Sequence, residues 1–91
     1  MIWKIQGDFV GLDALRLKND FLEQLEIPGP PKNIMMDLAA VDYIDSAAIS
    51  VLIEVAQSAA RKQIAFSLMH ANDSVKKVLE ITHLNKILTL L

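Results

Sequence analysis

Ser46 is the residue whose position offers the clearest chemistry. It directly follows Asp45 and begins a stretch in which apolar residues recur at helical spacing, so we expect its hydroxyl to stand at the start of a helix. Free backbone amides and the positive end of the helix dipole favour an added phosphate there, whereas the carboxylates of Asp42 and Asp45 oppose it. A phosphate would therefore change the local charge sharply without breaking the fold. The simpler alternative is that Ser46 is only an N-cap, which stabilises a helix by about 1 kcal/mol.

The other reactive side chains lack the spacing that enzymes need. The three glycines form neither the G-x-G-x-x-G nor the G-x-x-x-x-G-K-[ST] pattern of nucleotide sites. His70 and His83 are separated by thirteen positions and have no second ligand at helical spacing, so each is expected to be a surface or cap histidine. No motif places a base beside Ser46, which makes a small hydrolase the least favoured alternative. We expect a protein that is not an enzyme and that holds no cofactor or metal.

Composition narrows the class of protein further. The 91 residues carry a net charge of −2 and no cysteine, and the pI is about 5.5. This charge argues against a nucleic-acid partner, and the lack of cysteine fits a reducing cytoplasm. No apolar run reaches the roughly 18 residues of a spanning helix, and residues 1–5 lack the features of a secretory signal. We expect one cytoplasmic domain, residues 1–91, without membrane insertion.

Hydrophobic periodicity predicts the elements that position Ser46. Three short runs read as strands, and three runs with apolar residues every three to four positions read as helices. The predicted strands are Ile2–Gln6, Asn33–Leu38 and Ile64–His70, and the predicted helices begin at Asp13, at Ser46 and after Asn72-Asp73. Asp13 and Asn72-Asp73 are the expected N-caps of the first and third helices. Residues 87–91 are either a final strand or an apolar tail.

This order of elements predicts an α/β fold with a mixed β-sheet of about four strands, a parallel core and three or more helices. Gly7 is expected to end the first strand. The near-continuous apolar middle of Asn33–Leu38 indicates a central strand that is covered on both faces. The carboxylates of Asp37, Asp42 and Asp45 lie at the end of this strand and in the loop after it, where α/β sheets place binding sites. Taken alone, they are interpreted as solvated loop residues and charges at a helix start.

The second predicted helix, Ser46–Lys62, has an ambiguous apolar face. Ile49, Leu52, Ile53, Ala56 and Ala60 form one stripe, and Ala47, Val51 and Val55 form a shoulder between that stripe and the polar side. The shoulder is either exposed beside Ser46 or part of a broad core face. If it is exposed, it forms a docking surface together with Ser50 and Glu54.

Two stretches resemble a known family. Residues 35–49 (MMDLAAVDYIDSAAI) are similar to the apolar strand, link and Val-Asp-Phe-Ile-Asp-Ser-Ser-Gly-Leu-like helix start of the STAS domain, the fold of anti-sigma factor antagonists. Residues 75–88 (VKKVLEITHLNKIL) are similar to the closing helix of that family and the turn after it. The resemblance covers nearly the whole chain. Ala47-Ala48 stands where the family has Ser-Gly, and the residues after Gly7 also differ. The family often has a further strand before the one predicted at Ile2–Gln6, and this N-terminal strand is expected to be shortened or absent here.

The resemblance implies a binding module under phosphorylation control. In such antagonists the anti-sigma factor, a serine kinase, phosphorylates the serine that corresponds to Ser46, the unphosphorylated form binds that kinase, and a phosphatase resets it. The alternative is a STAS subunit that is not phosphorylated and docks on the ATPase of an ABC-type lipid transporter or on a signalling scaffold. The candidate partner-binding residues are Asp42, Asp45, Ser46, Ala47, Ser50, Val51, Glu54 and Val55.

Overall fold

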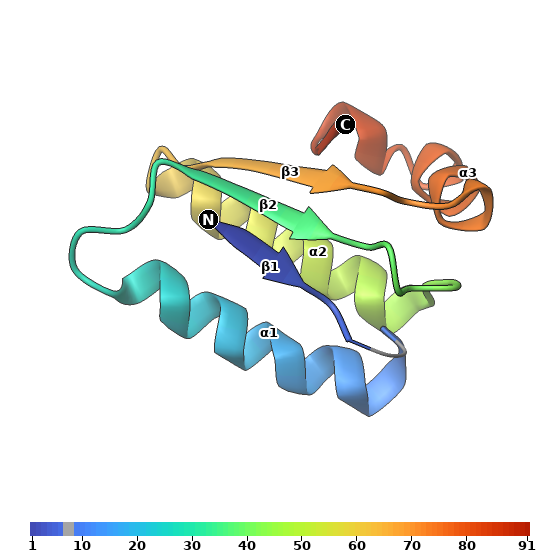
Figure 1. The fold of residues 1–91 in the computed structure, drawn as a ribbon, viewed down its shortest axis with the longest axis horizontal. Helices are drawn as coiled ribbons and strands as arrows, with labels where there is room; N and C mark the ends of the chain where they lie inside the picture. The colour runs from blue at the N-terminus through green and yellow to red at the C-terminus, as the bar shows by residue number, and fades with distance from the viewer. Residues whose placement is uncertain (7–8) are drawn as a thin grey trace.

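The protein alternates strands and helices along the whole chain (Figure 1). The computed structural model describes residues 1–6 and 9–91; Gly7, the expected end of the first strand, and Asp8 lie outside the described residues. The strands are β1 (Ile2–Lys4), β2 (Asn33–Asp37), β3 (Ala65–Met69) and β4 (Thr89–Leu90). The helices are α1 (Gly11–Glu26), α2 (Ser46–Arg61), α3 (Asp73–Ile81) and a 3-10 turn, Leu84–Lys86.

The strands form one sheet in the order β1-β2-β3-β4, and every neighbouring pair is parallel. In the described residues this confirms the predicted α/β fold, with about four strands, a parallel core and three or more helices. The described sheet is parallel throughout instead of mixed, because a helical crossover follows each of the first three strands and returns the chain to the same end. Residues 87–91 were predicted to form either a final strand or an apolar tail. The strand is confirmed for Thr89–Leu90, which pairs with β3.

The helices cover one face of this sheet. Because the strand order is sequential, right-handed crossovers place each connecting helix on the same side, and Figure 1 shows α2 passing behind β2 and β3. The strand residues that point toward the helices are buried, while the alternate ones, such as Met35 and Ser67, keep some exposure. The prediction that Asn33–Leu38 is covered on both faces is therefore wrong.

Helices α1 and α2 run parallel to each other along the covered face. Two ion pairs join them, Lys18 to Glu54 at 3.6 Å and Glu26 to Lys62 at 3.3 Å. Trp3 of β1 stacks on Phe21 of α1 with ring centroids 4.6 Å apart. None of the helices in the described part of the chain is both long and apolar enough to cross a membrane.

Helix α1 begins earlier than predicted. It starts at Gly11, with Val10 at the N-cap position and no side-chain cap from Val10. Gly11 has a φ of +52°, a left-handed conformation that glycine adopts without strain. Asp13 therefore lies inside the first turn of α1, and its prediction as the N-cap is wrong. The amide of Gly11 finds its partner in a different element, described below.

Candidate functional site

Ser46 is the first residue of α2, and its side chain is exposed. The N-cap of α2 is Asp45, whose Oδ1 accepts a hydrogen bond of 3.0 Å from the amide of Ala48. The alternative in which Ser46 itself caps the helix is therefore wrong. Among the described residues the Ser46 hydroxyl has no hydrogen-bond partner, so it stays accessible at the positive end of α2.

Asp45 caps two helices at once. Its second carboxylate oxygen, Oδ2, accepts a hydrogen bond of 3.0 Å from the amide of Gly11 at the start of α1. Just before these two helices, Phe9 and Ile44 form a parallel β-bridge, which brings the two helix starts together. The amide of Ala48, and then that of Gly11, hold the pKa of Asp45 below its usual value, so the carboxylate is ionised at neutral pH.

The loop between β2 and α2 is tied to a third element. The side-chain amide of Asn72 donates to the carbonyls of Val41 and Asp42 at 3.2 and 2.8 Å. The oxygen of the same side chain accepts from the amide of Val75 at 2.8 Å, which confirms the prediction of an N-cap for α3 at this position. The loop contact joins residues about thirty positions apart, and no local sequence pattern predicts it.

The predicted partner-binding residues divide into two groups. Asp42, Ser46, Ser50 and Glu54 are exposed, and Asp45 and Ala47 are half-buried. Val51 and Val55 are 0% exposed and belong to the core, which settles the ambiguous shoulder as part of a broad core face. The reason is that α2 packs against α1 as well as the sheet, so two of its sides are covered. A folded domain cannot offer either valine to a partner.

One exposed aromatic residue near Ser46 was not among the candidates. Tyr43 is 56% exposed and lies between Asp42 and the buried Ile44. No local pattern identifies its outward direction, because strict alternation would place Tyr43 on the same side as the buried Val41. Exposed aromatic side chains are common anchors in protein interfaces.

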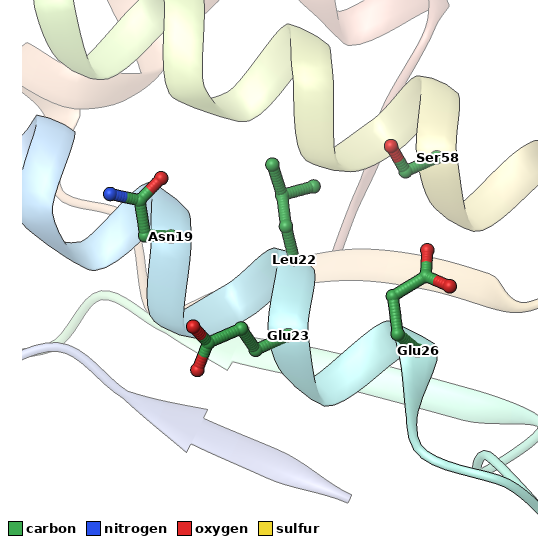
Figure 2. A pocket seen from close by; sticks show the side chains of 5 residues that line it. All are labelled: Asn19, Leu22, Glu23, Glu26 and Ser58. Carbon is green, nitrogen blue, oxygen red and sulfur yellow. The ribbon is translucent and has the colours of Figure 1, made fainter.

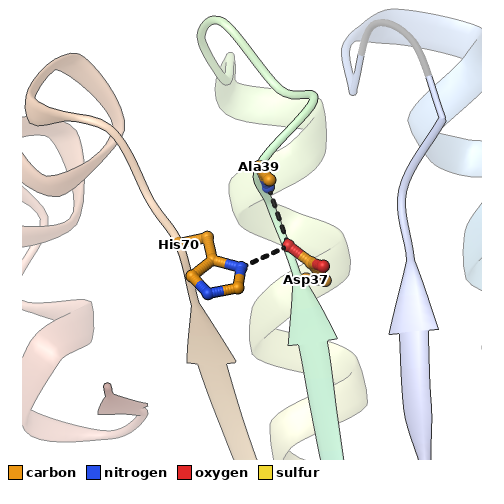
Figure 3. Close-up of polar contacts among 3 residues, drawn as sticks. All are labelled: Asp37, Ala39 and His70. Atoms are coloured by element: carbon orange, nitrogen blue, oxygen red, sulfur yellow. Dashed lines mark hydrogen bonds and ion pairs between the residues drawn. The ribbon is translucent and has the colours of Figure 1, made fainter.

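A second polar cluster lies at the carboxyl ends of β2 and β3 (Figure 3). Asp37 Oδ1 accepts a hydrogen bond of 3.0 Å from the amide of Ala39 and lies 3.0 Å from Nδ1 of His70. The Ala39 amide, and then the His70 side chain, hold the pKa of Asp37 below its usual 3.8. His70 is a surface residue, as predicted, with 63% of its side chain exposed.

The lowered pKa of Asp37 sets a pH dependence of stability. Asp37 stabilises the fold through its ionised form, so its contribution is fully present above pH 3.8 and is lost as pH falls through the lower pKa of the folded state. In the Asp37→Asn variant this contribution is absent at every pH. We expect the difference in urea midpoint between wild type and Asp37→Asn to shrink as the pH falls below 4. A difference that grows below pH 4 would contradict the assignment.

A groove lies elsewhere, between the carboxyl-terminal halves of α1 and α2 (Figure 2). It has a volume of about 460 Å³ and is lined by Asn19, Leu22, Glu23, Glu26 and Ser58. Figure 2 shows Leu22 of α1 pointing toward α2. Ser58 is twelve residues after Ser46, which corresponds to about 18 Å along a helix. The groove is therefore separate from the Ser46 site.

Comparison with known proteins identifies the fold. A sulfate transporter family protein from Wolinella succinogenes matches with a TM-score of 0.84 and 21% identity over 96% of this chain and 69% of its own. The anti-sigma factor antagonist SpoIIAA in its unphosphorylated form matches with a TM-score of 0.83 and 11% identity over 99% and 77%. An anti-sigma factor antagonist from Mycobacterium paratuberculosis gives 0.77 and 16% over 98% and 74%.

These structural matches span both regulatory and transporter-linked proteins. At such identities they establish the fold, and they include the class of protein that the resemblance of residues 35–49 and 75–88 suggested. Family membership rests on the sequence itself, because the model of the STAS domain matches residues 1–91, the whole chain. The protein belongs to the STAS domain family.

Proposed function

We propose that the protein is a cytoplasmic anti-sigma factor antagonist that works by partner switching. Its unphosphorylated form binds an anti-sigma factor that is also a serine kinase, phosphorylation of Ser46 releases that partner, and a phosphatase restores the binding form. The observation that carries the proposal is the arrangement at the start of α2. Asp45 takes over the capping role, which leaves the Ser46 hydroxyl exposed and without a structural task.

The surroundings of Ser46 favour a phosphate that weakens binding of a partner and leaves the fold intact. The first amides of α2 and the helix dipole favour a dianion at this position. The carboxylate of Asp45, which precedes Ser46, and that of Asp42 in the adjoining loop repel it. A phosphate adds about −1.5 to −2 charges at neutral pH. Burying that charge in a protein contact costs desolvation energy, so we expect the partner to dissociate.

Ser46 acts in this proposal as a substrate group and a contact, not as a nucleophile. A nucleophilic serine needs a base within hydrogen-bond reach, and in the described part of the chain no histidine bonds to Ser46. His70, the histidine with a carboxylate neighbour, pairs with Asp37 at the ends of the strands. A serine-directed phosphonate is therefore expected to leave Ser46 unlabelled.

The central experiment compares three forms of residue 46. Wild type and Ser46→Ala are expected to bind the purified anti-sigma factor kinase of the source organism with similar affinity in calorimetry. Ser46→Asp is expected to bind at least about tenfold more weakly, because it brings a charge into the contact. Ser74→Asp is the matched control, since it adds the same charge to an exposed position in the first turn of α3. Equal affinities for all three forms of residue 46 would refute partner switching.

A constitutive docking subunit is the second candidate function. It is supported by the similarity to a sulfate transporter family protein and by Ala47-Ala48, which replaces the Ser-Gly of the resemblance. Under this proposal the partner is the ATPase of an ABC-type lipid transporter or a signalling scaffold. The intact mass of the protein purified from its native cells would then show no phosphate, and an ATPase would copurify with it.

A further inference from the structure

We propose that Asn72 is a positioning residue for the Ser46 site. The inference rests on the proposed function and names a residue that lies outside the predicted docking surface. Through one side chain, Asn72 joins the start of α3 to the loop that leads into Ser46. In this role Asn72 does not contact the partner. It fixes the backbone of the loop before Ser46, and that loop contacts the partner.

The three hydrogen bonds of Asn72 use both ends of its amide. The Oδ1 atom accepts from the amide of Val75, and Nδ2 donates to the carbonyls of Val41 and Asp42. Only this orientation of the amide matches donors with acceptors, because the two carbonyls cannot donate and the backbone amide cannot accept. Asn72 is thus an N-cap and a tether at the same time.

The tether acts at a specific point of the loop. Val41 is buried at 1% exposure, and its amide donates to the carbonyl of Leu38 at 3.0 Å, so the first half of the loop is anchored to the core. Asp45 anchors the end of the loop through its two caps. Between these anchors, the carbonyl of Asp42 is held by Asn72. The tether therefore sets the course of the exposed Asp42-Tyr43 segment beside Ser46.

Two substitutions separate the cap from the tether. Asp and Ser cap helices about as well as Asn. Neither reproduces the tether: the carboxylate of Asn72→Asp has no hydrogen to donate, and the side chain of Asn72→Ser is one atom shorter and lacks the amide group. Asn72→Ser is uncharged, so an effect that both variants share cannot come from charge. Asn72→Ala removes the cap and the tether together.

The test measures affinity and stoichiometry for the same purified kinase by calorimetry. Asn72→Asp and Asn72→Ser are expected to bind about three- to tenfold more weakly than wild type, with unchanged stoichiometry and with thermal midpoints within a few degrees of it. A merely structural role would instead lower the fraction of competent protein, and hence the stoichiometry. Ser74→Asp adds the same charge two residues further along the chain, in the first turn of α3, and is expected to bind like wild type.

The possible outcomes distinguish this inference from the proposed function. If Ser46→Asp weakens binding while both tether variants bind like wild type, Asn72 is only a cap and the inference is wrong. If the tether variants lose stoichiometry and melt as early as Asn72→Ala, the effect is one of folding, and the inference is again wrong. If wild type and Ser46→Asp bind the kinase equally, the proposed function itself fails.

Discussion

Replacing Val51 by aspartate is expected to prevent the domain from folding. Val51 is 0% exposed on the side of α2 that packs into the core. An unpaired carboxylate at such a position costs several kcal/mol, which is comparable to the total stability of about 5 to 14 kcal/mol for a domain of this size. Trp3, the single tryptophan, is 6% exposed and stacked on Phe21. Its emission in the variant is therefore expected to shift to the red, as in denaturant.

The neighbouring position provides the matched control. Ser50 is exposed on the same turn of α2, so Ser50→Asp adds the same charge without burying it. We expect this variant to keep the native tryptophan emission and a thermal midpoint within a few degrees of wild type. Val51→Thr, which is close to isosteric, should remain folded with reduced stability. A folded Val51→Asp protein that has lost only partner binding would place Val51 on the docking surface and contradict its place in the core.

The order and type of the elements could be predicted because they depend on local patterns. The apolar spacing from Ser46 to Lys62 predicted a helix that the structure confirms at Ser46–Arg61. Asn72 was recognised as part of a cap because the residue type and the apolar run after it are adjacent in sequence. Such signals need no knowledge of what packs against the element.

Which side of each helix or strand is buried by its neighbours could not be predicted in the same way. Val55 and Ala60 are both apolar residues of α2, yet Val55 is buried and Ala60 is exposed. Helix α2 packs against both α1 and β3, and its covered sides include Val55 but not Ala60. The apolar middle of β2 suggested two covered faces, but the sequential strand order leaves one face with some exposure. Both errors arise because periodicity describes one element, whereas burial depends on its neighbours.

The sequence predicted the central residues of the candidate site, but not the long-range hydrogen bonds that hold them in place. The Asp-Ser sequence at a helix start was enough to select Ser46 and Asp45. The second bond of Asp45, to Gly11, joins residues 34 positions apart, and the bonds of Asn72 to the loop span 30 and 31. Only the folded chain shows that these two caps each serve a second element.

Replacing Asp45 by alanine is expected to destabilise two helices together. The substitution removes the acceptors of the Ala48 and Gly11 amides, and Val10 supplies no side-chain cap to α1. In a domain of this size, the loss of one N-cap bond lowers the thermal midpoint by about 4 to 8 °C. We therefore expect Asp45→Ala to melt about 8 to 16 °C below wild type in circular dichroism. Asp42→Ala, which removes an exposed carboxylate from the same loop, is the control and should melt like wild type.

Asparagine at position 45 tests whether the two bonds belong to one carboxylate. Its single carbonyl oxygen can accept from Ala48 or from Gly11, while its amide group would face the other donor. The midpoint of Asp45→Asn should therefore lie between those of wild type and Asp45→Ala. Hydrogen exchange would locate the loss, because asparagine is a good N-cap for its own helix, and so the first turn of α1 should lose protection while α2 keeps it. If exchange in α1 stays as slow as in wild type, the start of α1 does not depend on Asp45, and the double cap does not stabilise it.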